Sequence, residues 1–140
     1  MKAASNNNLA RMQFSVPSTK PDVGEVVDRI HAFAADHLCE PAALHRAQLV
    51  SNEVINNALI HGNGSDPNKM IRVEAVANGA FFTLRVEDEG HGFDLQAVPD
   101  PLHDENIMRD HGRGLHLIKE LADVVAFECE GRCVSVTIRE

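Results

Sequence analysis

Two adjacent asparagines stand inside a stretch that otherwise has the apolar spacing of a helix, SNEVINNALIHGNG at residues 51–64. Asparagine is unfavourable there by roughly half a kcal/mol relative to alanine, because its amide competes for nearby backbone groups. Residues four apart share one helix face, so Glu53, Asn57 and His61 form a polar line. A carboxamide oxygen is a neutral, hard ligand that suits Mg²⁺. The line predicts an ion site at Glu53 and Asn57, although Glu53 alone would be interpreted as an ordinary solvated side chain.

A second candidate site follows the strand-like stretch FFTLRVEDEG at residues 81–90. Continuing its alternation of apolar and polar residues puts Asp88 on the apolar side. A carboxylate removed from water is costly without a partner, so Asp88 is expected to have a hydrogen-bond donor. Gly90 and Gly92 permit a positive φ and close approach of the backbone to a ligand. Taken alone, DEGHG fits a tight turn capped by Asp88 as well as it fits a ligand-binding loop.

The third candidate is HGRGLHLI at residues 111–118, where Gly112 and Gly114 precede the start of a helix. The free N–H groups and the dipole at a helix start favour an anion, although a packing turn would use two glycines as well. The sequence contains no GxxxxGK[ST] motif, and no strand of a βαβ unit precedes this segment. These two absences exclude a P-loop and a Rossmann dinucleotide site.

The periodicity of the first half of the chain predicts one strand and two helices. Residues 9–18 alternate as a strand, and a helix starts at Ser18 or Thr19 with apolar residues at helical spacing through residue 34. A second helix starts after the Cys39–Glu40–Pro41 break and is stopped by Gly62 and Gly64. Its predicted buried stripe comprises Ala43, Ala47, Val50, Val54 and Ala58.

The second half predicts two hairpins and a third helix. Residues 69–88 read as a hairpin that turns at Asn78–Gly79, and residues 94–111 as a long polar loop. A helix follows from Gly114, and residues 124–139 form a second hairpin that turns at Glu130–Gly131. This order indicates an α+β, two-layer sandwich with a mostly antiparallel sheet.

Composition and charge narrow the classes of function. A chain of 140 residues with 44% hydrophobic residues is expected to form one domain. A net charge of −8 argues against nucleic-acid or anionic-membrane partners, which require clustered cations. No apolar leader or membrane span is evident, so we expect a cytoplasmic protein. The three cysteines lack CxxC spacing, which favours reduced thiols, and the scattered histidines do not indicate a transition-metal site.

Together the three stretches resemble a known family. NEVINNALIHGN, VEDEGHGFD and GRGLHLIKELAD resemble the N box and the two glycine-rich boxes of the GHKL ATPase superfamily, which includes histidine-kinase catalytic domains and gyrase. The spacing is most similar to that of small anti-sigma-factor serine kinases, over residues 10–139. The resemblance implies the Bergerat (histidine-kinase-like ATPase) fold, a sheet covered on one face by three helices. Residues 1–8 would be a flexible N-terminus and residues 9–140 the ATPase domain.

The resemblance also implies ligands, ATP and Mg²⁺, and roles for individual residues. Asn57 would bind Mg²⁺, Glu53 would polarise or deprotonate the attacking hydroxyl, and Asp88 would accept a hydrogen bond from the adenine amine. Gly90 and Gly92 would shape the wall beside Asp88. We therefore expect the amide of Asn57, the carboxylate of Asp88 and the helix start at residues 112–115 to converge on one nucleotide.

The remaining implied residues belong to the phosphate side of the site. The backbone amides of four residues would face the phosphates: Gly112, Arg113, Gly114 and Leu115. The long polar loop would be an ATP lid with Arg109 as its cation, and Asn56 would line the same pocket or cap its edge. Where the family often has Gly-Thr in the last hairpin, this chain has Gly131–Arg132, which puts the threonine contact in doubt.

The function implied is that of an ATP-dependent serine/threonine protein kinase and anti-sigma factor. It would phosphorylate a STAS-domain anti-sigma-factor antagonist, sequester a sigma factor and form a homodimer near the strand at residues 9–16. Three alternatives stay open: a nucleotide-dependent sequestering protein with little phosphotransfer, a standalone histidine-kinase-like module acting in trans, and a scaffold that binds no nucleotide. Retention of Glu53 favours the enzyme over the binder.

Overall fold

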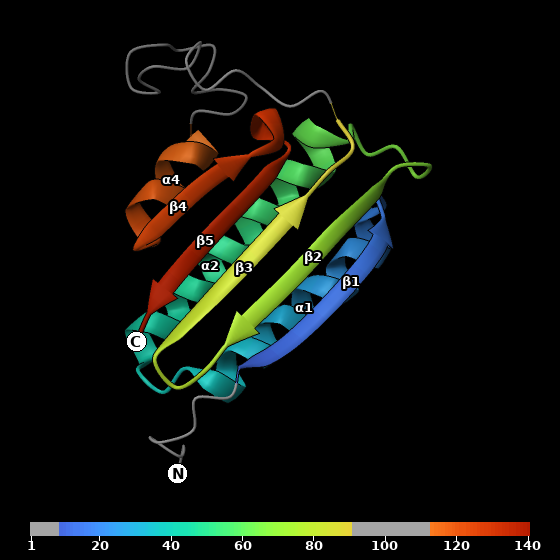
Figure 1. Cartoon of the computed structure of the whole chain (residues 1–140). Helices are drawn as coiled ribbons and strands as arrows, with labels where there is room; N and C mark the ends of the chain where they lie inside the picture. Colours follow the sequence, from blue (N-terminus) through green and yellow to red (C-terminus); the bar gives the residue numbers. More distant parts are fainter. Residues whose placement is uncertain (1–8, 91–112) are drawn as a thin grey trace.

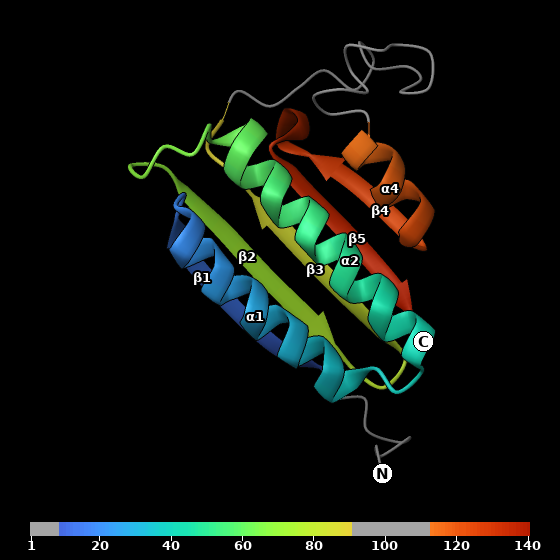
Figure 2. The same ribbon diagram turned by 180° about the vertical axis from the view of Figure 1, so that it is seen from behind.

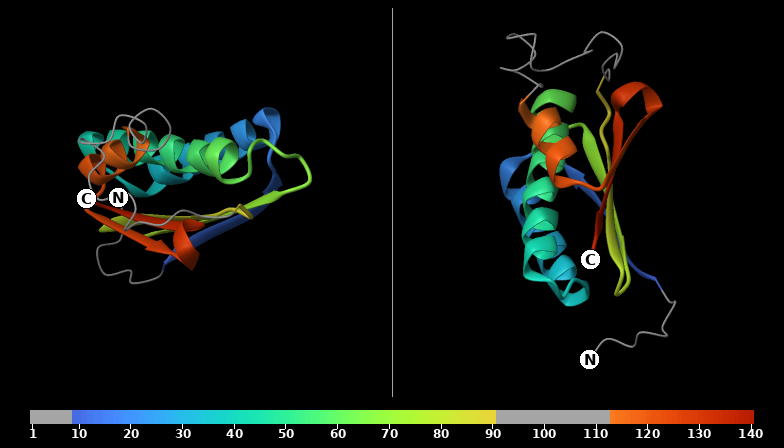
Figure 3. Two further views of the ribbon diagram at one scale, coloured as in Figure 1. Left: turned by 90° about the horizontal axis from the view of Figure 1, so that it is seen from above. Right: turned by 90° about the vertical axis from the view of Figure 1, so that its left-hand side faces the viewer.

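The computed structural model describes residues 9–90 and 113–140, which form an antiparallel sheet with helices on one face (Figures 1 and 2). The strand order of the five-stranded sheet is β1-β2-β3-β5-β4. Viewed along the edge of the sheet, helices and strands make two layers (Figure 3). The strands are β1 (Ala10–Pro17), β2 (Met70–Ala77), β3 (Phe81–Glu87), β4 (Val124–Glu128) and β5 (Cys133–Arg139). The α-helices described are α1 (Lys20–His37), α2 (Pro41–Asn57) and α4 (Arg113–Leu121).

The predicted α+β architecture is therefore confirmed, including the order of the elements. Every neighbouring pair of strands is antiparallel, in both hairpins and in the pairs β1–β2 and β3–β5. None of the helices in the described ranges has the length and apolar character needed to cross a bilayer.

The core lies between the sheet and the helices because apolar residues alternate along the strands and recur at helical spacing. Phe82, Leu84 and Val86 of β3 are almost fully buried, as the alternation predicted. The predicted stripe of α2 is buried along its whole length, from Ala43 to Ala58. On the other face of the sheet, charged side chains pair across strands, as in Arg11–Glu74 and Arg72–Glu87.

The helices begin at residues that satisfy their free N–H groups. Thr19 caps α1 by accepting a hydrogen bond from the Asp22 N–H, and Glu40 caps α2 by accepting from Ala42 and Ala43. A proline stands in the first turn of α1 and of α2, where its missing N–H costs nothing. These caps fix where α2 starts and hence which of its residues reach the end of the sheet.

The last turn of the second helix is not regular α-helix. After Asn57 the helix continues as a π-helical segment, η1 (Ala58–Gly62), whose closing bond runs from the Asn63 N–H to the Ala58 carbonyl at 2.9 Å. The chain leaves the helix at Gly64 and Ser65, both with positive φ. The helical segment therefore ends at Gly62 and the chain turns away at Gly64, as the two glycines predicted.

The two hairpin turns are made differently. At the first, the Asn78 side chain accepts hydrogen bonds from the N–H groups of Ala80 and Phe81, so asparagine closes the turn with its carboxamide. At the second, Cys129, Glu130 and Gly131 all have positive φ, within the short segment η4 (Cys129–Gly131). This turn carries Gly131 to the end of the sheet that faces η1.

Candidate functional site

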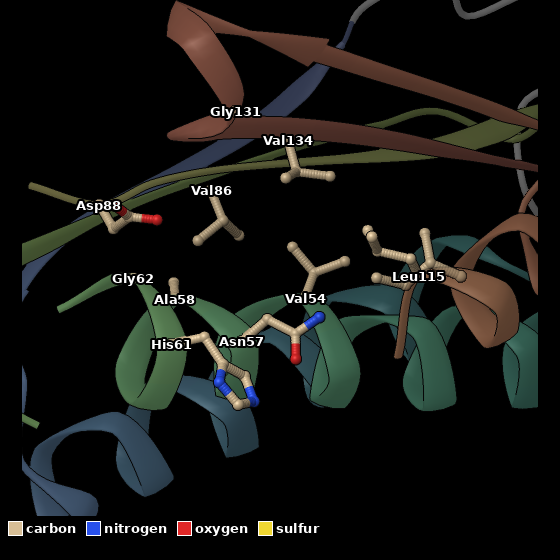
Figure 4. Close-up of a pocket in the computed structure, with 11 residues that line it drawn as sticks. Val54, Asn57, Ala58, His61, Gly62, Val86, Asp88, Leu115, Gly131 and Val134 are labelled. Atoms are coloured by element: carbon tan, nitrogen blue, oxygen red, sulfur yellow. The ribbon is translucent and has the colours of Figure 1, made fainter. Parts of the chain in front are cut away.

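A cavity of about 90 Å³ lies between the C-terminal end of α2, the start of α4 and the adjoining ends of β3 and β5 (Figure 4). In Figure 4, Asp88 stands at one end of the cavity and Leu115 at the other, with Val54, Val86 and Val134 between them. Most of its wall is apolar, and few polar side chains reach it. The lining residues are Val54, Asn57, Ala58, His61, Gly62, Val86, Asp88, Leu115, Ile118, Gly131 and Val134.

Asp88 directs one carboxylate oxygen to its own turn, and the other lies against Gly62 at the wall of the cavity. Its Oδ1 accepts a hydrogen bond from the Gly90 N–H at 2.8 Å. No donor among the described residues makes a hydrogen bond to Oδ2. Burial raises the pKa of Asp88 above its ordinary value, and the Gly90 N–H and the charge of Arg132 oppose this rise. A half-buried carboxylate with a free oxygen in an apolar cavity is suited to accept a hydrogen bond from a ligand amine.

Two glycines allow the approach of η1 to the turn after β3. A Cβ built on Gly62 would lie 2.3 Å from Asp88 Oδ2, and one built on Gly90 would lie 2.0 Å from the Gly62 carbonyl oxygen. Neither position tolerates a side chain unless the backbone or the carboxylate moves. The π-helical turn and this pair of glycines together set Asp88 against the end of α2.

At the other side of the cavity, Gly114 of α4 lies against the polar line of α2. A Cβ built on Gly114 would be 2.9 Å from Asn57 Nδ2 and 3.4 Å from Glu53 Oε2. The predicted pair Glu53–Asn57 therefore meets the first turn of α4, whose leading N–H groups have no partner within the helix. An amide oxygen, a carboxylate and free N–H groups close together can bind a metal ion and the anion that accompanies it.

The donor set suits a magnesium ion that comes with its own phosphate ligands. Within residues 9–90 and 113–140, no group of three or more His, Cys, Asp and Glu side chains is placed to hold a metal ion. Mg²⁺ does not need such a cage, because it keeps several waters and takes one or two protein oxygens. A side chain at position 114 would collide with the Asn57 amide, so glycine there keeps the amide uncovered at the start of α4.

Most of the described residues in the predicted site come together. Asn57, Asp88 and Leu115 line one cavity, Gly90 packs on Gly62, and Glu53 and Gly114 adjoin Asn57. Arg113 begins α4. The predictions for Gly92, Arg109 and Gly112 fall outside the described residues. The expected convergence of position 57, position 88 and the helix start is therefore present, and the chemical roles stay predictions.

Of the two alternatives expected for Asn56, that it lines the pocket is wrong. Asn56 is exposed and does not line the cavity, because each step along a helix turns the side chain by about 100° and carries it away from the face of Asn57. His61 and Gly62 do line the cavity, although neither was predicted to be a binding residue. The signal for His61 was its position in the polar line, and the signal for Gly62 was its place at the helix end.

Arg132, which stands where the family often has threonine, makes hydrogen bonds within and next to its own turn. The Arg132 side chain folds back onto its own turn, with Nε donating to the Cys129 carbonyl at 3.1 Å. Its backbone carbonyl accepts the Asp88 N–H at 2.9 Å, and Gly131 lines the cavity. This turn therefore supports Asp88 through the main chain, which is a different contact from that of the family's threonine hydroxyl.

Comparisons with known proteins agree with this geometry. The sequence profile of a family described as a histidine kinase-like ATPase domain matches residues 16–138. The anti-sigma F factor of Geobacillus stearothermophilus is 28% identical over 125 residues, covering 88% of this chain and 84% of the relative. The anti-sigma F factor of Geobacillus kaustophilus gives the same values. That of Bacillus cytotoxicus is 25% identical over 135 residues, covering 93% of this chain and 91% of the relative.

Proposed function

The chain belongs to the histidine kinase-like ATPase domain family, and from this premise we propose that it is an ATP-dependent serine/threonine protein kinase that also acts as an anti-sigma factor. Its protein substrate is a STAS-domain antagonist, and its second partner is a sigma factor. The relatives named anti-sigma F factor support this choice within the family. The observation that supports phosphotransfer most is the meeting of Glu53 and Asn57 with the first turn of α4.

In the proposed reaction, the residues at one end of the cavity bind the base and those at the other end bind the phosphates. Asp88 Oδ2 accepts a hydrogen bond from the adenine amine, and the apolar wall around Val54, Val86 and Val134 packs on the base. The N–H groups at the start of α4 bind phosphate oxygens. Asn57 Oδ1 would hold Mg²⁺, whose positive charge would offset the negative charge of the transferring phosphoryl group. Glu53, one helical turn before Asn57, orients the hydroxyl of the acceptor and takes up its proton.

A homodimer and the exchange of partners complete the proposal. β1 is an edge strand of the sheet, so its outer backbone groups are available to a second copy. Phosphorylation of the antagonist prevents it from competing for the kinase and leaves the sigma factor bound. Analytical ultracentrifugation tests this arrangement. A wild-type dimer that dissociates when β1 is truncated would support it, and a monomeric wild-type protein would count against it.

The deciding experiment is transfer of labelled phosphate from ATP to the STAS-domain protein that co-purifies with this chain. The wild-type protein should label the partner with acid-stable phosphate. Glu53→Gln should bind Mg·ATP and lose transfer by roughly 10²-fold or more, since it removes the proton acceptor. Glu25→Gln, an exposed carboxylate of α1, is the matched control and should transfer normally.

The alternatives predict other outcomes in the same assay. Nucleotide binding with no label on the partner would favour a sequestering protein, and acid-labile label would favour transfer to histidine. Absence of Mg·ATP binding by the wild-type protein would overturn the proposed function.

A further inference from the structure

Asn63 is a buried polar residue that lies next to the cavity without lining it. It is 2% exposed, and the other buried polar residues of the described chain are Ser18 and Ser51. The Ser51 hydroxyl donates to the Ala47 carbonyl within α2. Asn63 instead connects segments that are far apart in the sequence, so its burial is not explained by local helix structure.

The Asn63 carboxamide joins three segments through bonds in both directions. Its Nδ2 donates to Ser18 Oγ at 2.8 Å and to the Met70 carbonyl at 3.0 Å, and its Oδ1 accepts the Glu89 N–H at 2.7 Å. These partners stand after β1, at the start of β2 and after β3. A flipped amide would set NH₂ against the Glu89 N–H and oxygen against the Met70 carbonyl, so only one orientation satisfies all three bonds.

The hydrogen bond between Asn63 and Glu89 lies just beyond the last paired residues of β3 and β5. The last pair of β3 and β5 is Glu87 with Cys133, and the Asp88 N–H still reaches the Arg132 carbonyl. The next N–H, that of Glu89, is taken by Asn63, and the one after it, that of Gly90, by Asp88 Oδ1. Asn63 therefore fixes the peptide plane between Asp88 and Glu89, on which the position of the Gly90 N–H depends.

The same stretch touches Asp88 from the other side. Gly62, which precedes Asn63, lies so close to Asp88 that a Cβ would fall 2.3 Å from Oδ2. The carboxylate is thus held between the Gly62 backbone and the Gly90 N–H, and Asn63 ties both of these segments together. Ser18 anchors the arrangement by donating to the Lys69 carbonyl at 2.7 Å.

We propose that Asn63 is a positioning residue that sets base selectivity through Asp88. By holding the Glu89 N–H, its amide keeps the turn after β3 in the conformation that points Oδ2 of Asp88 into the cavity, where it selects a base with an exocyclic amine at the matching position. The inference rests on the proposed nucleotide binding and adds the group outside the cavity that determines which base is accepted.

The first test compares ADP with GDP by calorimetry in the presence of Mg²⁺. Asn63→Ala should weaken ADP binding by roughly tenfold, the effect of losing one well-placed hydrogen bond to a charged group, and should leave GDP binding almost unchanged. The ratio of the two affinities should therefore fall. Ser51→Ala is the matched control, because it removes a buried hydroxyl whose bond lies within α2; its ratio should equal that of the wild type even where its melting temperature drops.

A double-mutant cycle separates positioning from general destabilisation. If Asn63 acts through Asp88, then Asn63→Ala should change the ADP to GDP ratio in the wild-type background and leave it unchanged in an Asp88→Ala background. If Asn63→Ala changes the ADP to GDP affinity ratio by the same factor in both backgrounds, the inference is overturned. A folded Asn63→Ala variant whose affinity ratio equals that of the wild type would also overturn it.

A milder variant keeps the test decisive where Asn63→Ala does not fold. Ser18→Ala removes one of the three bonds of Asn63, so it should lower the ratio by a smaller factor and speed hydrogen exchange of the Glu89 N–H. If Ser18→Ala speeds hydrogen exchange of the Glu89 N–H and leaves the ADP to GDP affinity ratio unchanged, the inference is overturned and the proposed function is not affected. Absence of ADP binding by the wild-type protein would overturn both.

Discussion

The α-carbon of Gly114 lies against the side-chain amide of Asn57, so that a Cβ added at Gly114 would stand 2.9 Å from Nδ2 and 3.2 Å from Oδ1. The two residues belong to α4 and α2, whose contact closes one side of the cavity. Glycine at this position leaves the Asn57 amide where it can meet a ligand at the start of α4.

Gly114→Ala is therefore expected to separate binding from stability. The new methyl group should push the Asn57 amide aside, and because that amide is the free end of a side chain, the fold should accommodate the movement. Alanine also improves helix propensity by up to about 1 kcal/mol, which offsets part of the strain. We expect Mg·ATP affinity to fall by roughly tenfold or more in calorimetry, while the unfolding free energy changes by less than about 1 kcal/mol. Unchanged affinity would contradict the assignment of Asn57.

Asp88→Asn should raise stability at neutral pH while lowering nucleotide affinity. Burial raises the pKa of Asp88 in the folded protein, so the ionised carboxylate costs stability once the pH rises through that pKa. Asparagine removes this cost and can still accept the Gly90 N–H. The variant should resist denaturant better than the wild type at pH 7, and the gain should shrink as the pH falls toward the unfolded-state value of 3.8.

Calorimetry on the same variant measures the other half of this prediction. Loss of a charged acceptor should weaken ADP binding by roughly ten- to a hundredfold. A variant that is both less stable at pH 7 and equally good at binding ADP would contradict both the burial argument and the role of Asp88.

The fold could be predicted from the sequence because its signals are local. Thr19 and Glu40–Pro41 mark helix starts through bonds to the next turn, and the alternation of β3 follows from burial on one face. The convergence of Asn57, Asp88 and Leu115 was predicted by the resemblance of three separate motifs, since no single motif specified it.

The rest depends on distant contacts that no short pattern carries. The π-helical turn at Ala58–Gly62 packs against the turn after β3, and helical periodicity cannot distinguish it from a normal last turn. The bonds of Asn63 to Ser18 and Glu89 join residues on three segments, and the sequence shows only an asparagine after a glycine. Asn56 was misjudged because its neighbour Asn57 made it look like part of the site.

Cys133 should be protected from alkylation in the folded protein. It is fully buried, and burial raises the pKa of its thiol to about 11, so that about one thiol in a thousand is ionised at pH 8. Cys39 and Cys129 are exposed and free. Iodoacetamide followed by peptide mass spectrometry should modify these two quickly and Cys133 only when the protein unfolds. Equal rates at Cys133 and Cys39 without denaturant would contradict the described packing.

Gly24→Ala should stabilise the protein without affecting its function. Gly24 lies in α1, and a Cβ built there meets nothing within 4 Å. Alanine should raise the free energy of unfolding by about 0.5–1 kcal/mol, because it reduces the freedom of the unfolded chain. Urea denaturation measures the gain, and Mg·ATP affinity should stay at the wild-type value. The variant also serves as the glycine-to-alanine control for Gly114.

Asp123→Asn should reduce stability at neutral pH and lose its effect in acid. Asp123 Oδ2 accepts the Arg139 N–H at 2.7 Å and a longer bond from Arg46 Nη1 at 3.4 Å, so it joins the end of α4 to β5 and α2. These bonds, the Arg139 N–H first, lower the pKa of Asp123 below its ordinary 3.8. A lowered pKa contributes stability above 3.8 that is lost as the pH falls through the folded value. Because the site is largely open to solvent, we expect a loss of about 1 kcal/mol or less at pH 7. Urea unfolding at pH 7 and at a pH well below 3.8 measures the difference, with Asp36→Asn, an exposed carboxylate of α1, as the control. If Asp123→Asn lowers the free energy of unfolding by as much in acid as at pH 7, then the carboxylate charge does not stabilise the contact of α4 with β5 and α2.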